Sequence, residues 1–77
     1  MNYIYGINTS LVCDEEGAWH RVYGIDCREV DSGALVRHVE GIFCCRADAL
    51  DLAELCTRLE LSPDHLCDVI CDALSGI

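Results

Sequence analysis

The side chains with the greatest chemical potential are seven cysteines and three histidines in a chain of 77 residues. Cys67 and Cys71 lie four residues apart in a segment of helical periodicity, so their thiols should emerge on adjacent turns. This spacing suits two ligands of one metal ion, and thiolates combined with imidazole favour zinc. Further candidate ligands come from elsewhere in the chain: Cys44, Cys45, Asp64, His65 and His38. The pattern predicts a zinc site built around the cysteine pair.

Two other interpretations of these cysteines stay open. The chain has no Cys-x-x-Cys pair and no finger-like ligand spacing, and free cysteine is also a common small core residue. The first interpretation is therefore that the cysteines are ordinary core residues. The second is a reversible disulfide between Cys67 and Cys71, although the neighbouring acids disfavour the reactive thiolate. An odd number of cysteines in a chain without a secretory leader argues against a disulfide framework.

The sequence predicts no catalytic residues. Cys67, His65 and Asp68 have the types of a nucleophile, a base and an orienting acid, but they lie within three residues of one another. Neighbours on one helix cannot surround a substrate and also supply an oxyanion hole. Lysine and a glycine-rich phosphate loop are absent from the sequence. We therefore expect a protein that is not an enzyme.

The acidic charge is the strongest functional signal, because fourteen acids against five arginines give a formal net charge of -9. This excess argues against direct nucleic-acid binding and favours a basic protein surface as the partner. Six acids recur along the two C-terminal segments: Asp64, Asp68, Asp72, Asp48, Asp51 and Glu54. Carboxylates repeated every four residues destabilise a helix. They predict an anionic docking stripe, and the alternative is a solvated face that keeps the chain soluble.

An alternation of apolar and polar residues predicts three strands. They cover residues 2–13, 18–30 and 34–44. The alternation assigns Leu11, Trp19 and Tyr23 to the core-facing side, and Gly41 marks a predicted bulge. The acidic turn ending at Gly17 separates the first two strands, because glycine accepts positive φ.

Apolar spacings of three and four predict helices over 48–60 and 62–75. The two predicted core stripes are Ala49, Leu52, Leu55, Cys56 and Leu59, and Leu66, Val69, Ile70, Ala73 and Leu74. Ser62 is the predicted N-cap of the second helix, Pro63 occupies its first turn and Gly76 ends it. The sequence therefore predicts one α+β domain over 1–77, a three-stranded antiparallel meander followed by two C-terminal helices packed on one sheet face.

The C-terminal run resembles an uncharacterised family of small bacterial proteins. Tyr23-Gly24-Ile25 and the stretch Leu61–Val69, with the pattern Leu-Ser-Pro-x-His-Leu-x-Asp-Val, carry the likeness. Cys67 and Cys71 depart from it, since polar or acidic residues are expected there. The resemblance implies a compact bacterial or phage-borne domain and no activity.

Charge, size and the lack of catalytic motifs together predict a small acidic interaction protein. We expect it to bind and inhibit or regulate a basic, nucleic-acid-handling protein such as a nuclease, and anti-CRISPR proteins are similar to it in class. The alternative is a small structural-zinc domain with an unknown partner. No leader and no run of about 20 apolar residues is present, so we expect a cytoplasmic protein. The identity of the partner and the oligomeric state stay open.

Overall fold

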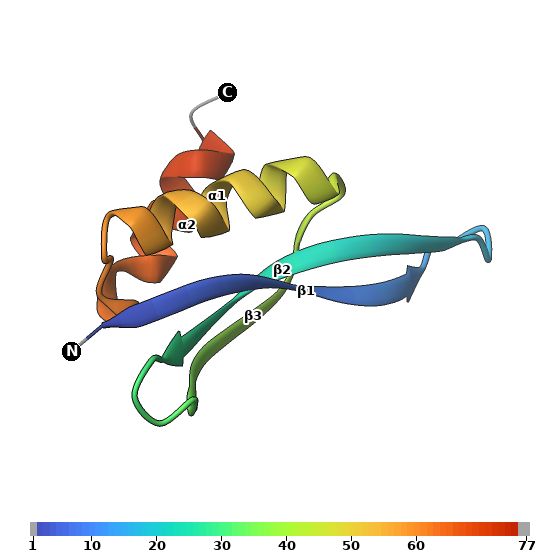
Figure 1. Ribbon diagram of the computed structural model, residues 1–77. Coiled ribbons are helices and arrows are strands. Elements are labelled where there is room, and N and C mark those ends of the chain that lie inside the picture. Colours follow the sequence, from blue (N-terminus) through green and yellow to red (C-terminus); the bar gives the residue numbers. More distant parts are fainter. Residues whose placement is uncertain (1, 76–77) are drawn as a thin grey trace.

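The three strands come first along the chain and the helices follow them, as Figure 1 shows. The structure is a computed structural model and describes residues 2–75. The elements are β1 (Tyr3–Cys13), β2 (Trp19–Glu29), β3 (Leu35–Phe43), α1 (Arg46–Arg58), the 3-10 helix η1 (Pro63–His65) and α2 (Leu66–Ser75). The strands form an antiparallel sheet in the order β1-β2-β3. This confirms the α+β arrangement of a three-stranded antiparallel sheet followed by two helices. That both helices pack on one sheet face stays a prediction.

The first hairpin is regular over its whole length. Its register runs from Tyr3 opposite Glu29 to Cys13 opposite Trp19. In the turn, the Asp14 carboxylate accepts hydrogen bonds from two backbone N–H groups at 2.9 Å each. Gly17 has a φ of 84°, the left-handed conformation predicted for it.

The second hairpin contains the predicted bulge. Tyr23 of β2 lies opposite Phe43 of β3, whereas Ile25 lies opposite Val39, so residues 40–42 face a single residue of β2. Gly41, in the middle of the extra residues, has a φ of 65°. A glycine is favoured there because other residues rarely adopt that conformation.

Gly24 is the single β2 residue opposite the bulge, and it lies almost against the backbone of β3. A Cβ atom at this position would lie 1.9 Å from the carbonyl oxygen of Val39 and 2.8 Å from Cα of Glu40. It would also lie 2.7 Å from Oδ1 of Asn8 on β1. Only glycine allows the three strands to meet at this point.

The core joins the sheet to both helices. Its buried members are Tyr5, Ile25 and Cys27 from the sheet, Leu52, Ala53 and Cys56 from α1, and Leu66 and Ile70 from α2. Ile25 and Leu66 are the largest side chains that are fully buried. The hydrophobic layer between sheet and helices therefore depends on residues from both ends of the chain.

Hydrogen bonds close the outer edge of β1 against α1. Thr57 Oγ1 accepts from the backbone N–H of Tyr5 at 2.9 Å and can donate to the carbonyl of Ala53 at 2.9 Å. The Tyr5 hydroxyl donates to the carbonyl oxygen of Leu61 at 2.7 Å. Burial raises the pKa of Tyr5, which keeps its hydroxyl neutral and able to donate. The edge groups of β1 at this point are thus unavailable to another strand.

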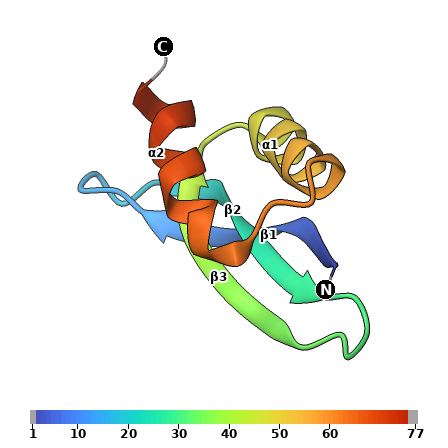
Figure 2. The same cartoon turned by 90° about the vertical axis from the view of Figure 1, so that its left-hand side faces the viewer.

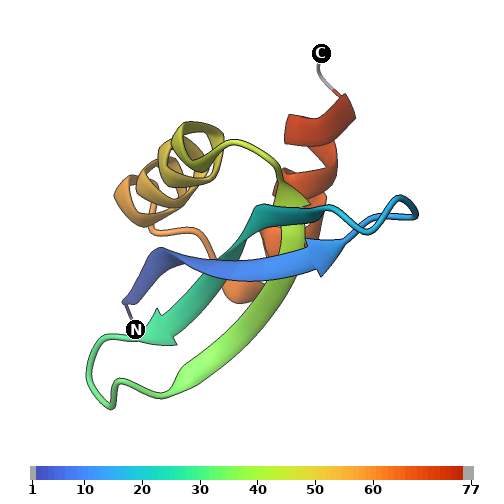
Figure 3. The same ribbon diagram turned by 90° about the vertical axis from the view of Figure 1, so that its right-hand side faces the viewer.

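Several predicted core residues are exposed instead. Trp19 and Leu11 lie at the far end of the first hairpin, which extends past the helices (Figures 1 and 3). The alternation of side chains is as predicted there, but none of the described residues forms a second layer over that part of the sheet. In α1, Ala53 is buried while Leu55 and Leu59 are exposed, so the helix turns a smaller residue toward the sheet.

The second helix also differs from the prediction. The segment begins as η1 and continues as α2, with Ser62 preceding it and making no side-chain capping bond. Only Leu66 and Ile70 of the predicted stripe are buried, and Ala73 and Leu74 are exposed. The reason is geometric, since α2 rises away from the strands toward its C-terminal end (Figure 2). The predicted stop at Gly76 lies outside the described residues.

Candidate functional site

The seven cysteines lie in four parts of the fold (the end of β1, the core, the connection between β3 and α1, and α2), and all of them are free thiols. Cys67 and Cys71 are exposed on adjacent turns of α2, and Cys44 and Cys45 are exposed between β3 and α1. Within residues 2–75, no three histidine, cysteine, aspartate or glutamate side chains form a group that could hold a metal ion. The structure therefore does not bring the predicted zinc ligands together.

Cys27 and Cys56 are core residues. Core packing was the alternative to a zinc site that the sequence left open for the cysteines. Both are buried in the cluster that joins the sheet to the helices. Burial raises the pKa of the Cys56 thiol, and the nearby Cys27 adds to the effect. An enclosed thiol is a poor nucleophile and a poor metal ligand, so these two contribute packing.

All six acids predicted to bind a partner are exposed, but they do not form one row. Asp68 and Asp72 lie on α2, whereas Asp64 belongs to η1. One Asp64 carboxylate oxygen lies 3.5 Å from Nη2 of Arg37 on β3, and both side chains are largely exposed. A pair of this kind is worth about 0–1 kcal/mol, so it leaves Asp64 available to a stronger partner.

A groove of about 390 Å³ separates α1 from α2. Its lining is mostly apolar and carries two carboxylates: Phe43, Asp48, Asp51, Leu52, Leu55, Ala73 and Leu74. The volume falls in the range of about 300–1,000 Å³ that is common for binding pockets. Sequence reasoning missed the groove because it assigned four of these residues to the core: Leu52, Leu55, Ala73 and Leu74. Of the predicted partner residues, only Asp48 and Asp51 line it.

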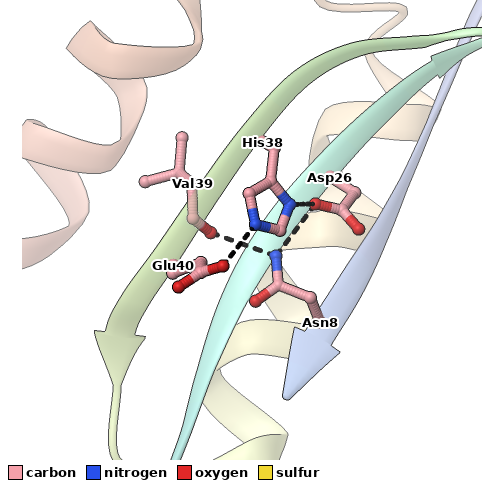
Figure 4. Close-up of polar contacts among 5 residues, drawn as sticks. All are labelled: Asn8, Asp26, His38, Val39 and Glu40. Atoms are coloured by element: carbon pink, nitrogen blue, oxygen red, sulfur yellow. Dashed lines mark hydrogen bonds and ion pairs between the residues drawn. The ribbon is translucent and has the colours of Figure 1, made fainter. Parts of the chain in front are cut away.

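A polar network spans the three strands (Figure 4). His38 Nδ1 lies 2.6 Å from Oδ1 of Asp26, and His38 Nε2 lies 2.7 Å from Oε1 of Glu40. Asn8 Nδ2 donates to the same Asp26 oxygen at 2.9 Å and to the carbonyl of Val39 at 3.1 Å. Sequence reasoning named His38 only as a further candidate zinc ligand and did not pair it with Asp26. The available signal was the strand register, which places Asp26 directly opposite His38.

This network stabilises the positively charged form of His38 and leaves neither ring nitrogen free to act in catalysis. The hydrogen bonds to Glu40 and Asp26 raise the pKa of His38, because both carboxylates stabilise the imidazolium form. With a carboxylate on each ring nitrogen, the imidazole has no free nitrogen for a substrate or a metal. His20 makes a simpler pair, 2.7 Å from Asp14, and that contact lowers the pKa of the Asp14 carboxyl.

These features define a small acidic α+β domain with exposed carboxylates on its helices. The chain belongs to a family of unknown function, DUF6514, whose sequence model matches residues 1–76. The expected resemblance to an uncharacterised family is thereby confirmed. No curated protein and no solved structure matches the chain. Within residues 2–75, no helix has the length and apolar character needed to cross a membrane.

Proposed function

We propose that this chain is a non-enzymatic, acidic interaction protein that binds a basic surface on a nucleic-acid-handling protein and thereby inhibits or regulates it. The observation that supports this most is the charge of the helical half. Between residues 46 and 75, seven acids stand against two arginines. Among the acids predicted to bind a partner, only Asp64 has an ion pair within the described residues. A set of carboxylates without partners favours arginine and lysine on another protein.

The positions of the acids suit such a partner. Asp68 and Asp72 are four residues apart on α2, so their carboxylates are neighbours on one helical face. A guanidinium group can bridge two acceptors of this kind. Basic groups that ordinarily contact phosphate would then be occupied by carboxylate, which competes directly with DNA or RNA. A cytoplasmic, anti-CRISPR-like inhibitor of a nuclease is the sharpest form of this proposal.

Affinity capture from a bacterial lysate at low salt tests the proposal. The bait is the purified chain, compared with a variant in which the three C-terminal acids are neutralised, D64N/D68N/D72N. We expect the wild type to retain a basic nucleic-acid-binding protein, and the variant to lose it. Retention should also fall steeply as salt is raised, because exposed charges are screened beyond about 10 Å at 0.1 M salt.

A control variant with the same net charge separates the effect of the helical acids on binding from the effect of net charge alone. Glu15, Glu16 and Asp31 are exposed acids in the turns of the sheet, so E15Q/E16Q/D31N removes the same three charges elsewhere. The control should bind like the wild type. If both triple variants bind equally well, or lose binding equally, the helical acids are not the docking surface.

The zinc alternative has less support from the geometry. Cys67 and Cys71 could hold an ion from adjacent turns of α2, but the remaining ligands would have to come from another part of the chain or from another molecule. Elemental analysis of the purified chain, with melting curves in chelator, tests it. Substoichiometric zinc together with an unchanged melting temperature would reject a structural metal.

A further inference from the structure

We propose that two copies of this chain form a two-fold dimer through one face of the sheet. The strand register and the alternation of side chains place six residues together on this face. We call them the strand patch: Ile4, Gly6, Asp26, Arg28, Val30 and Leu35. The proposal goes beyond binding to a basic partner, because it uses the sheet and none of the helical acids.

The aliphatic side chains of the strand patch are exposed. Ile4 of β1 and Leu35 of β3 both pair with Arg28 of β2, and they are 51% and 48% exposed. Val30, two residues further along, is 54% exposed. Each of the three regions thus adds an uncovered aliphatic side chain to one surface. A contiguous apolar surface of this kind marks an interaction site more often than scattered apolar residues do.

Gly6 creates a hollow beside Ile4. The hollow has a volume of about 330 Å³, and its lining includes Ile4, Gly6, Asp26 and Arg28. A Cβ atom on Gly6 would have no atom within 4 Å, so the space above this residue is open. Ile4 and Gly6 are two residues apart on the same side of β1. A projecting side chain therefore lies one step along the strand from a space that can receive one.

The two charges of the patch have the same spacing, because Asp26 and Arg28 are two residues apart on β2. Oδ1 of Asp26 contacts His38 at 2.6 Å, whereas Oδ2 has no hydrogen bond within residues 2–75. Arg28 donates to the carbonyl oxygen of Gly33 at 3.3 Å and has no ion pair among the described residues. In a chain with a formal net charge of -9, this patch holds one acid and one arginine. Both can still bind a group of opposite charge.

A second copy, turned about a two-fold axis that crosses the strands between these positions, matches both features. Such an axis reverses the strands, so that residue 4 of one copy faces residue 6 of the other, and residue 28 faces residue 26. Each Ile4 then enters the hollow at Gly6 of the other copy. Each Arg28 meets the carboxylate of Asp26, and sheets that pack face to face bring such side chains into contact.

This self-complementarity favours a second copy as the occupant. The hollow and the projecting side chain, and the acid and the base, are each offset by two residues in the same direction. A two-fold contact satisfies all four at once, because every residue of an isologous interface meets its counterpart twice. A foreign protein would have to carry the same spacing on its own surface.

Sedimentation equilibrium tests the dimer over about 10 μM to about 1 mM protein, in reducing agent and at about 0.15 M salt. The salt screens repulsion between two acidic chains, and the reducing agent excludes disulfide-linked species. We expect the mass to rise from 8.5 kDa toward twice that value. A chain that stays monomeric at the highest concentration would overturn the proposal.

Filling the hollow separates dimer formation from folding. G6V places an isopropyl group in a space that is open in a single copy, and valine is favoured in strands. The melting temperature of dilute G6V should therefore not fall. In the dimer the new side chain occupies the site of Ile4, so we expect the dissociation constant to rise about tenfold or more. A folded G6V variant that dimerises like the wild type contradicts the proposed docking.

A charge placed on either face of β1 locates the contact. I4E and L11E both change an exposed aliphatic residue of this strand. Their odd separation puts them on opposite faces, so L11E is the matched control. We expect the dimer to weaken about tenfold or more in I4E and to be unchanged in L11E. Equal dissociation constants for the two variants would place the contact elsewhere and overturn the proposal.

A double-mutant cycle tests the ion pair across the two-fold axis. R28Q and D26N should each weaken the dimer about threefold or more, because each removes both copies of the pair. The double variant R28Q/D26N should lose less than the product of the two single effects. Circular dichroism checks that all three variants are folded. Effects that multiply fully would show that Arg28 and Asp26 do not meet, and would overturn the proposed register.

Discussion

The close approach of β2 and β3 at Gly24 leads to a strong prediction about stability. Replacing Gly24 with alanine adds one methyl group at a site where Cβ would lie 1.9 Å from a backbone carbonyl oxygen. Because this nearest atom belongs to the backbone of β3, no side-chain rotation can relieve the clash with it. The two strands must separate at the bulge, and the neighbouring Asn8 must also move.

The magnitude follows from the cost of overpacking. Extra methyl groups in a packed site cost about 1–3 kcal/mol, and more where the backbone must shift. We expect about 3 kcal/mol or more for G24A, out of a total stability of roughly 4–12 kcal/mol for a chain of this length. A loss of about 3 kcal/mol corresponds to a fall in melting temperature of roughly 12–24 °C.

Gly6 provides a control on the neighbouring strand. A Cβ atom there would have nothing within 4 Å, and its φ is not in the left-handed region. G6A should therefore leave the melting temperature unchanged or raise it slightly, because alanine reduces the entropy of the unfolded chain by about 0.4–1 kcal/mol. Circular dichroism melts of both variants are the assay. If G24A melts within a few degrees of G6A, the strands do not approach as closely as described.

Three further predictions concern single side chains. Y5F removes the hydroxyl that donates to Leu61, and should cost about 0.5–1.5 kcal/mol in urea unfolding. L66A empties a fully buried site and should cost about 2–5 kcal/mol in the same measurement. H38Q should change how stability depends on pH. Since the folded pKa of His38 is raised, its stabilisation is complete below about pH 6.5 and is lost as pH rises through the folded pKa.

Each of these predictions has a distinct contradictory outcome. If the free energy of unfolding of Y5F equals that of the wild type, water replaces the hydrogen bond to the carbonyl oxygen of Leu61 without cost. An L66A variant that loses less than about 1 kcal/mol would place that side chain outside the core. For H38Q, the difference in melting temperature from the wild type should be larger at pH 6 than at pH 9. A difference that is constant with pH would show that the imidazolium contributes nothing.

Much of the fold was predictable because its signals are local. The alternation in the strands, the glycine at the bulge and the apolar spacing of the helices all depend on near neighbours. Gly41 is an example, because its predicted bulge is confirmed by the register of β2 and β3. Boundaries were accurate to a few residues, and the 3-10 turn at Pro63 was the main difference in helix type.

Which apolar residues are exposed was less predictable, because their exposure depends on how far the helices extend over the sheet. Trp19 follows the core alternation, yet the helices do not extend far enough to cover it. Leu55 and Leu74 have core-like spacing, yet they line an open groove. The contact between His38 and Asp26 needed the strand register, which periodicity alone does not supply. The exposed acids were visible in the sequence, because a large excess of one charge cannot be buried.

The bonds from Tyr5 to α1 and to the segment after it have a consequence for the order of events during synthesis. Tyr5 contacts Thr57 and Leu61, which lie 52 and 56 residues later in the chain. At about 5–20 residues per second, these partners are made several seconds after the first strand. A nascent chain that ends before α1 has both hairpins, but the edge of β1 at Tyr5 is open and no helix covers Ile25. The sheet is therefore completed only after α1 and the segment as far as Leu61 have been made, and until then its open edge can pair with other chains.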